Sequence, residues 1–264
     1  MRPVSPFIVI LFLIVAIPLL LGAESKNTGV PAGWSALQYD NYGNDLLNKH
    51  QFAESRKYFD AAIRVEPTRW TAYYNRATAY KMEGNYKAAL EDLNATIRFQ
   101  PAFFEASWVR AGVYASLGNY AAELKDLDIL AKVTFQVQNA GELALILSQR
   151  AWLRATCPNA SLRNSQLAIA DAKKACDLEK WKRSTYIDTL AAACAEAGDF
   201  DSAVRYEQQA ITLNRSGNDE ALKSFSKKYA EELGKGNAKR ICEYLQRLEL
   251  YKHRQPYRSP AKSS

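Results

Sequence analysis

The sequence predicts an all-α protein in which residues 36–216 form a solenoid of about five stacked helix hairpins. The first observation is a period of 34 residues: Gly-Asn-Tyr at 84–86 returns at 118–120, and Pro67 is followed at the same interval by Pro101. The second is the composition, because 264 residues with 48% hydrophobic and 24% charged side chains can bury a sizeable core. A fixed period of about 20 to 50 residues is typical of stacked-repeat proteins.

The recurring segment contains the turn chemistry of a helix hairpin. Gly84, Gly118 and Gly198 stand where a first helix has to end in the left-handed conformation that glycine adopts without steric cost. An asparagine or aspartate follows each glycine and can cap the second helix. Small residues such as Ala77 and Ala89 let the two helices approach closely. The pattern therefore predicts helix, turn and helix in each period.

Three hairpins with this period open at Ala36, Trp70 and Phe104. A fourth contains SQRAWLRATCP, with Ala151 as the small residue of its first helix. The fifth begins near Ser184 and recovers the full pattern in YIDTLAAACAEAGDFDSAV. No segment between these hairpins has the alternating pattern of a strand, and the chain is expected to contain none.

The hairpins depart from the common pattern at three places. In the first, His50 and Gln51 replace the Gly-Asn of the turn. In the third, Glu123 stands where a small residue is expected, which predicts a looser hairpin. In the fourth, the longer segment PNASLRNS predicts a longer turn before Ala168.

These residues resemble the tetratricopeptide repeat. AWLRATCP, YIDTLAAACAEAGDFDSAV and RLELYKHRQPYR are also similar to a largely uncharacterised group of exported bacterial repeat proteins. The resemblance covers residues 36 to about 258 and implies a right-handed superhelical solenoid that binds proteins. It is strongest in the second repeat, at Tyr73, Ala77, Tyr80, Gly84, Tyr86, Ala89 and Pro101.

The N-terminus has the pattern of a secretory signal peptide, because Arg2 precedes an apolar run that ends in a small residue. We expect residues 1–23 to be removed after Ala23. The alternative is an uncleaved anchor at residues 7–23, which is a marginal length for crossing a bilayer. Either interpretation predicts export to the periplasm, the cell envelope or the medium, and residues 24–35 are expected to be a linker.

The C-terminal region carries the excess positive charge. Residues 222–264 contain 11 Lys or Arg and 4 Asp or Glu. Apolar residues at helical spacing predict two helices within residues 217–252 that cap the open end of the solenoid. Residues 253–264 are expected to form a disordered basic tail.

The sequence offers little support for catalysis. It contains two histidines, His50 and His253, and no catalytic, phosphate-binding or dinucleotide motif that we recognise. We therefore predict a protein that is not an enzyme and has no catalytic residue, metal or cofactor. The cysteines are interpreted as buried structural residues, with one disulfide as the alternative, among Cys157, Cys176, Cys194 and Cys242.

The face formed by the first helices is the predicted binding site, because the resemblance places the ligand groove there. Aromatic side chains on such a face can hold an extended peptide or a partner helix. The alternative for each tryptophan is packing between neighbouring repeats. The candidate residues are Asn44, Tyr74, Thr78, Lys81, Trp108, Trp152 and Asp188.

The predicted function is a non-catalytic scaffold of the cell envelope that binds a protein or peptide partner in this groove. No nucleic acid is expected as a partner. The alternative is a surface tether whose basic tail binds anionic lipid or polymer.

Overall fold

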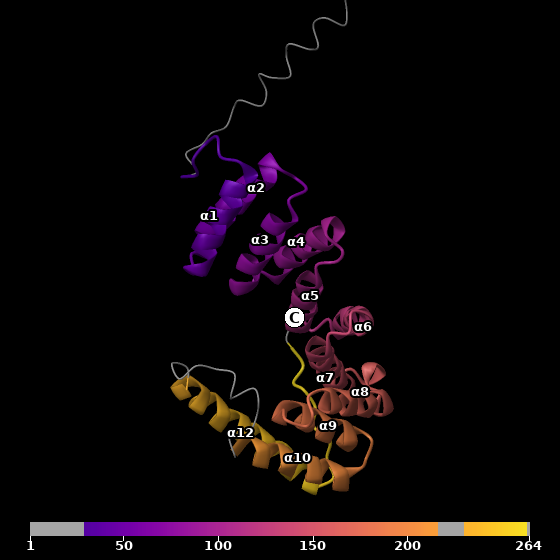
Figure 1. Cartoon of the computed structure of the whole chain (residues 1–264). Helices are drawn as coiled ribbons and strands as arrows, with labels where there is room; N and C mark the ends of the chain where they lie inside the picture. Colours follow the sequence, from indigo (N-terminus) through magenta and orange to yellow (C-terminus); the bar gives the residue numbers. More distant parts are fainter. Residues whose placement is uncertain (1–28, 216–229, 263–264) are drawn as a thin grey trace, which may run out of the picture. The chain divides into compact units, whose positions relative to one another are not determined.

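The computed structural model describes residues 29–215 and 230–262 (Figure 1). The all-α prediction is confirmed, because the elements of those residues are α-helices and one short 3-10 helix, without a strand. The chain divides into two compact units, with the boundary between Glu83 and Gly84. The proposed signal peptide or anchor, residues 1–23, lies outside the described residues.

The first unit contains α1 (Ala36–Asn48), α2 (Phe52–Val65) and α3 (Trp70–Met82). Ser35 caps α1 through a capping box with Gln38. The turn after α1 places His50 in the left-handed conformation at φ 59°, where three other hairpin turns have Gly84, Gly118 and Gly198. The turn therefore keeps the left-handed conformation with histidine in place of glycine, at some steric cost.

Part of the predicted linker, residues 24–35, is instead packed on this unit. Val30 and Trp34 contact the apolar cluster of α1 and α2. The Trp34 ring lies 5.6 Å from the Tyr39 ring, and the Tyr39 hydroxyl donates a hydrogen bond to the Pro31 carbonyl. The apolar area of Trp34, which the linker prediction ignored, explains the docking.

The second unit is built from paired helices joined by the predicted turns. Gly118 and Gly198 have φ of 70° and 81°, and Asn119 caps the helix that follows it. The pairs α5–α6, α7–α8 and α9–α10 each pack as a hairpin. The helices of this unit are α4 (Tyr86–Phe99), α5 (Phe104–Ser116), α6 (Tyr120–Gln136), α7 (Ala140–Thr156), η2 (Ala160–Leu162), α8 (Ser165–Leu178), α9 (Ser184–Glu196), α10 (Phe200–Arg215) and α12 (Ala230–Lys252).

The fourth hairpin begins earlier than its sequence pattern indicated. Asn139 caps α7 by accepting a hydrogen bond from the Glu142 amide, so the helix already includes the residues before Ser148. The predicted longer turn is present, and η2 lies within it. This start was missed because the turn before α7 has no proline, whereas Pro67 and Pro101 mark the turns before α3 and α5.

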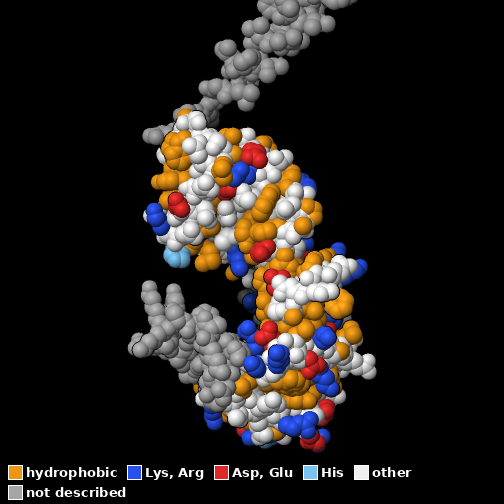
Figure 2. Space-filling view, viewed as in Figure 1, with side chains coloured by type: hydrophobic (Ala, Val, Ile, Leu, Met, Phe, Trp, Pro, Cys, Tyr) orange, Lys and Arg blue, Asp and Glu red, His pale blue; other side chains and the backbone are white. Residues whose placement is uncertain are grey.

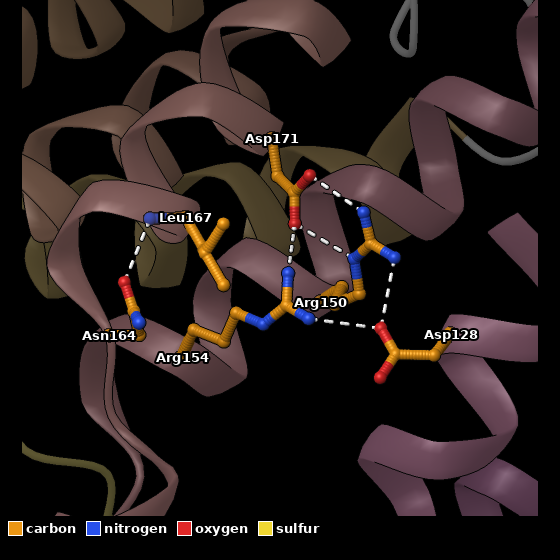
Figure 3. Close-up of polar contacts among 6 residues, drawn as sticks. All are labelled: Asp128, Arg150, Arg154, Asn164, Leu167 and Asp171. Carbon is orange, nitrogen blue, oxygen red and sulfur yellow. Dashed lines mark hydrogen bonds and ion pairs between the residues drawn. The ribbon is translucent and has the colours of Figure 1, made fainter.

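A network of four charged side chains joins α6, α7 and α8 (Figure 3). Asp171 accepts two hydrogen bonds from Arg150, at 2.7 and 2.8 Å, and one from Arg154, at 2.8 Å. Asp128 accepts one from each arginine at 2.9 Å. Because both guanidinium groups are largely buried and paired twice, the network sets the register of the three helices.

Three of the four cysteines are buried, as the interpretation as structural residues predicts. Cys157, Cys176 and Cys194 are buried, whereas Cys242 is exposed, and all four are free thiols. Burial raises the pKa of Cys176 to about 12 and that of Cys194 to about 11. These thiols therefore pack as small apolar groups.

The C-terminal region differs from the prediction in two ways. α12 is one continuous helix packed on α10, and the break expected between two capping helices falls inside it. Residues 216–229 lie outside the described part. Residues 253–262, expected to be disordered, lie against α7, α9 and the turn before α6. Their contacts with these helices hold them in place.

Candidate functional site

The first helices of the second unit present a face on which the end of the chain lies. We name four side chains of α7 and α9 the first-helix face: Trp152, Thr156 and Glu196, which contact the end of the chain, and Asp188, which pairs with Arg247 of α12. We name residues 253–262 the tail. Figure 1 shows the tail, in yellow, running from the end of α12 past α9 and α7 towards α5.

Three consecutive residues of the tail contact this face. The Tyr257 ring lies 5.7 Å from the Trp152 ring. The Arg258 guanidinium forms an ion pair with Glu196 at 2.6 Å. Ser259 donates its amide to the Thr156 carbonyl at 2.9 Å, and the hydroxyls of the two residues are 2.8 Å apart. The tail is thus held by an aromatic, a charged and a main-chain contact.

A buried charge cluster lies beside these contacts. Arg247 of α12 donates from Nε to Asp188 Oδ1 at 2.8 Å, and Glu207 Oε1 is 3.7 Å from the same nitrogen. Burial raises the pKa of Asp188. The pKa of Glu207 is raised well above its ordinary value, mainly by burial and secondly by the nearby charge of Asp188. Two carboxyl groups therefore share one cation. Asp188 joins α9 to α12 through its ion pair with Arg247.

The Arg247 guanidinium is also enclosed by aromatic rings. It lies 5.4 Å from the ring centre of Trp152, 5.2 Å from that of Tyr244 and 5.5 Å from that of Tyr257. Cation–π contacts of this kind are strongest where water is excluded. Trp152 consequently contacts both α12 and the tail.

A cleft of about 340 Å³ adjoins the cluster between α7, α9 and α12. Arg247 and Asp188 line it together with the exposed Leu145. It is lined by Leu145, Ser148, Gln149, Trp152, Thr185, Tyr186, Asp188, Thr189, Arg240, Glu243, Tyr244 and Arg247.

Glu123, the departure in the third hairpin, is buried on α6. Burial raises its pKa to about 7, while a hydrogen bond from Gln149 and the charge of Lys262 act in the opposite direction. The Lys262 amide donates to the Tyr120 hydroxyl at 3.3 Å. The far end of the tail therefore lies in an acidic environment that a small residue at position 123 would not provide.

The predicted site residues divide between the two units. Trp152 and Asp188 come together in the second unit, whereas Trp108, also in that unit, is half-buried against its apolar core. The other four belong to the first unit, on α1 and α3: Asn44, Tyr74, Thr78 and Lys81. Because the seven belong to two compact units, the groove that they are expected to form together stays a prediction.

In the first unit, the face of α1 and α3 is organised by Asp40. Its carboxylate accepts hydrogen bonds from Arg69 and Asn75 at 3.0 Å and from the Thr71 hydroxyl. Asn44, one turn further along α1, is exposed. Asp40 therefore fixes the spacing of the two helices and leaves Asn44 accessible.

The functional residues that sequence reasoning missed belong to α12 and the tail. Arg247, Tyr257 and Arg258 lie outside the repeat pattern, so no periodicity indicates which face they contact. The available signal was the alternation of aromatic and basic residues in RLELYKHRQPYR. Such residues can supply both cation–π and ion-pair contacts.

The fold and this site define a helical-repeat protein of the kind that presents binding surfaces. The tetratricopeptide repeat family model matches residues 43–102 and 83–132. Residues 43–132 therefore match tetratricopeptide repeats, and the tetratricopeptide part of the resemblance is confirmed. Proteins built from such repeats use extended faces as binding surfaces.

One curated relative matches a part of the chain. The Tetratricopeptide repeat and J domain-containing co-chaperone DNJ1 of Cryptococcus neoformans var. grubii is 38% identical over 82 residues. The match covers 31% of this chain and only 16% of the co-chaperone.

Solved structures with a similar fold cover more of the chain. MamA from Desulfovibrio magneticus RS-1 (residues 41 to the end) is 19% identical, covers 70% of this chain and 98% of its own, and has a TM-score of 0.56. YrrB, described as a TPR protein with an unusual peptide-binding site, is 16% identical, with coverages of 71% and 89% and a TM-score of 0.58. A tetratricopeptide repeat protein from Parabacteroides merdae is 18% identical, with coverages of 86% and 82% and a TM-score of 0.59. At these identities the likeness shows the fold.

None of the helices in residues 29–215 and 230–262 combines the length and hydropathy that crossing a bilayer requires. The same residues contain no group of three or more His, Cys, Asp or Glu arranged to hold a metal ion.

Proposed function

We propose that this protein is a non-catalytic scaffold that binds a protein or peptide partner on the faces formed by its first helices. The observation that carries the proposal is the tail itself. An extended segment lies on the first-helix face and is held through a main-chain hydrogen bond and two side chains. A surface that accepts an extended segment of this chain has the chemistry to accept one from another protein.

The same kind of face in the first unit supplies accessible positions for a partner. Asn44 is exposed on α1, and Tyr74, Thr78 and Lys81 are partly exposed on α3. An amide, a phenol, a hydroxyl and an ammonium together offer donors, acceptors and one aromatic surface. This mixture suits an extended peptide, in which polar main-chain groups alternate with side chains.

Site-specific photo-crosslinking tests the function. A photoreactive residue at position 44 or 81 is expected to capture the same partner from an extract of the native source, because both positions belong to the proposed face. The matched control is position 57, since Lys57 is exposed on α2 of the same unit. Capture of that partner with equal yield at all three positions, or at position 57 alone, would contradict the proposal, as would the absence of any captured protein.

We also propose that the protein works in the cell envelope after export. The basic start and apolar run of residues 1–23 support this, and the mature chain is then expected to begin at Glu24. N-terminal sequencing of protein from the native cell checks it. A chain that retains Met1 and fractionates with membranes would favour the anchor, and one that retains Met1 in the soluble cytoplasmic fraction would exclude export.

The alternative of a lipid or polymer tether has weaker support. Arg258 of the tail is already paired with Glu196. On the side of the molecule drawn in Figure 2, the coloured basic and acidic side chains of the second unit are interspersed and do not form a large patch of one sign. Attraction to an anionic surface depends on such a patch.

A further inference from the structure

The tail is bound in the manner of a peptide ligand, because each of three consecutive residues makes a different contact with the first-helix face. Tyr257 lies against Trp152, Arg258 pairs with Glu196, and Ser259 hydrogen-bonds to Thr156 through both its amide and its hydroxyl. The order of residue types along the segment is therefore aromatic, arginine and serine.

Glu196 favours a cation in the occupant of this face. One carboxylate oxygen pairs with Arg163 of the turn between α7 and α8 at 2.9 Å, and the other pairs with Arg258 at 2.6 Å. With the tail in place the second oxygen is shielded from solvent, and the Arg258 guanidinium is its counter-ion there. An occupant that brings a guanidinium restores this contact, whereas an acidic segment would be repelled.

The tail is attached loosely enough to be exchanged without unfolding the second unit. Residues 256–259 are only half-buried, and residues 260–262 are exposed. By contrast, Tyr244 and Tyr251 of α12 are 2% and 0% exposed. Segments with few buried contacts open at low free-energy cost while the core remains folded. The tail can therefore leave the face while α12 stays in place.

We propose, building on the scaffold function above, that the first-helix face is a binding site for an extended basic segment of another protein in which an aromatic residue is followed by arginine and a small hydroxyl residue. Residues 256–262 are the chain's own version of this ligand and compete with the partner. A tethered competitor acts at an effective concentration of the order of millimolar, so it lowers the affinity for an external peptide strongly.

The test uses the full chain and a fluorescent synthetic peptide, RQPYRSPAK, which is the sequence of residues 254–262. In the released variant, Tyr257→Ala plus Arg258→Ala, the intramolecular contacts are lost. This variant is expected to bind the peptide at least about tenfold more tightly than the wild type, as measured by fluorescence anisotropy. The matched control, His253→Ala plus Gln255→Ala, changes exposed tail side chains and should bind like the wild type.

Two further arms identify the contacts. A peptide with alanine in place of its tyrosine and arginine should lose binding to the released variant. Adding Glu196→Gln to that variant should weaken binding of the original peptide about tenfold, because the paired charge is lost. Circular dichroism checks that each variant keeps its helices.

The proposal is overturned if the folded released variant binds the peptide no better than the wild type. Wild-type dimers that form with concentration and disappear in the released variant would overturn it too, because the tail would then belong to a second copy. The scaffold function is tested separately: crosslinks at positions 44 and 81 lie in the other unit and do not depend on the tail. Failure of the peptide with retention of those crosslinks therefore removes this site alone.

Discussion

Replacing Arg247 with alanine is expected to destabilise the second unit by about 3–5 kcal/mol, because two buried carboxyl groups lose the cation that they share. Asp188 is 6% exposed, Glu207 is fully buried, and Arg247 itself is 5% exposed. The substitution also removes the guanidinium from between Trp152, Tyr244 and Tyr257. Urea denaturation followed by circular dichroism measures the loss.

The control for this prediction is Arg240→Ala. Arg240 is on the same helix and at the same cleft, but it is only partly buried. A change at such a position is expected to stay within about 0.5 kcal/mol. Adding Asp188→Asn and Glu207→Gln to Arg247→Ala should recover part of the loss, because the buried charges are removed. A single Arg247→Ala variant within about 1 kcal/mol of the wild type would show that the shared cation is unimportant.

Gly43→Ala is expected to destabilise the first unit by about 1–3 kcal/mol, although alanine is the better helix former. Gly43 lies in α1, and a Cβ atom at this position would be 2.7 Å from the ring of Phe59 in α2. Phe59 is fully buried, so its ring has little freedom to move. Hydrogen–deuterium exchange of peptides from residues 36–65 should show faster exchange in the variant.

Gly112→Ala provides the matched control. Gly112 is also a helical glycine, in α5, and a Cβ atom there would meet nothing within 4 Å. We expect this substitution to be neutral or to stabilise by up to about 1 kcal/mol. If Gly43→Ala behaves like Gly112→Ala, the close approach of α1 and α2 is not the reason for the glycine.

The helix hairpins could be predicted because their signals are local. A glycine with a positive φ, a capping side chain and a proline each act within a few residues, so the turns at Gly84, Gly118 and Gly198 are confirmed by their conformations. The early start of α7 was missed for the same reason. The turn before α7, at Asn139, lacks the proline that stands before α3 and α5 as Pro67 and Pro101.

The candidate site was predicted only in part. The repeat resemblance selected Trp152 and Asp188 as groove residues, and their binding role stays a prediction, but the resemblance could not indicate which side chains of this chain contact them. Arg247 is 59 residues from Asp188, and Tyr257 is more than 100 residues from Trp152, and no repeat relates either pair. Asp188 was therefore interpreted as a residue for a partner, whereas the structure pairs it with α12.

The sequence by itself determined the class of the fold, the turn positions and the repeat family, because short-range steric and hydrogen-bond preferences decide where helices begin and end. Only the tertiary structure decided that the Trp34 segment is docked and that the tail covers the first-helix face. Those outcomes depend on burying an aromatic ring and on pairing Glu196 and Asp188 with distant arginines. Such contacts join groups that are far apart in the sequence, so no local sequence pattern indicates them.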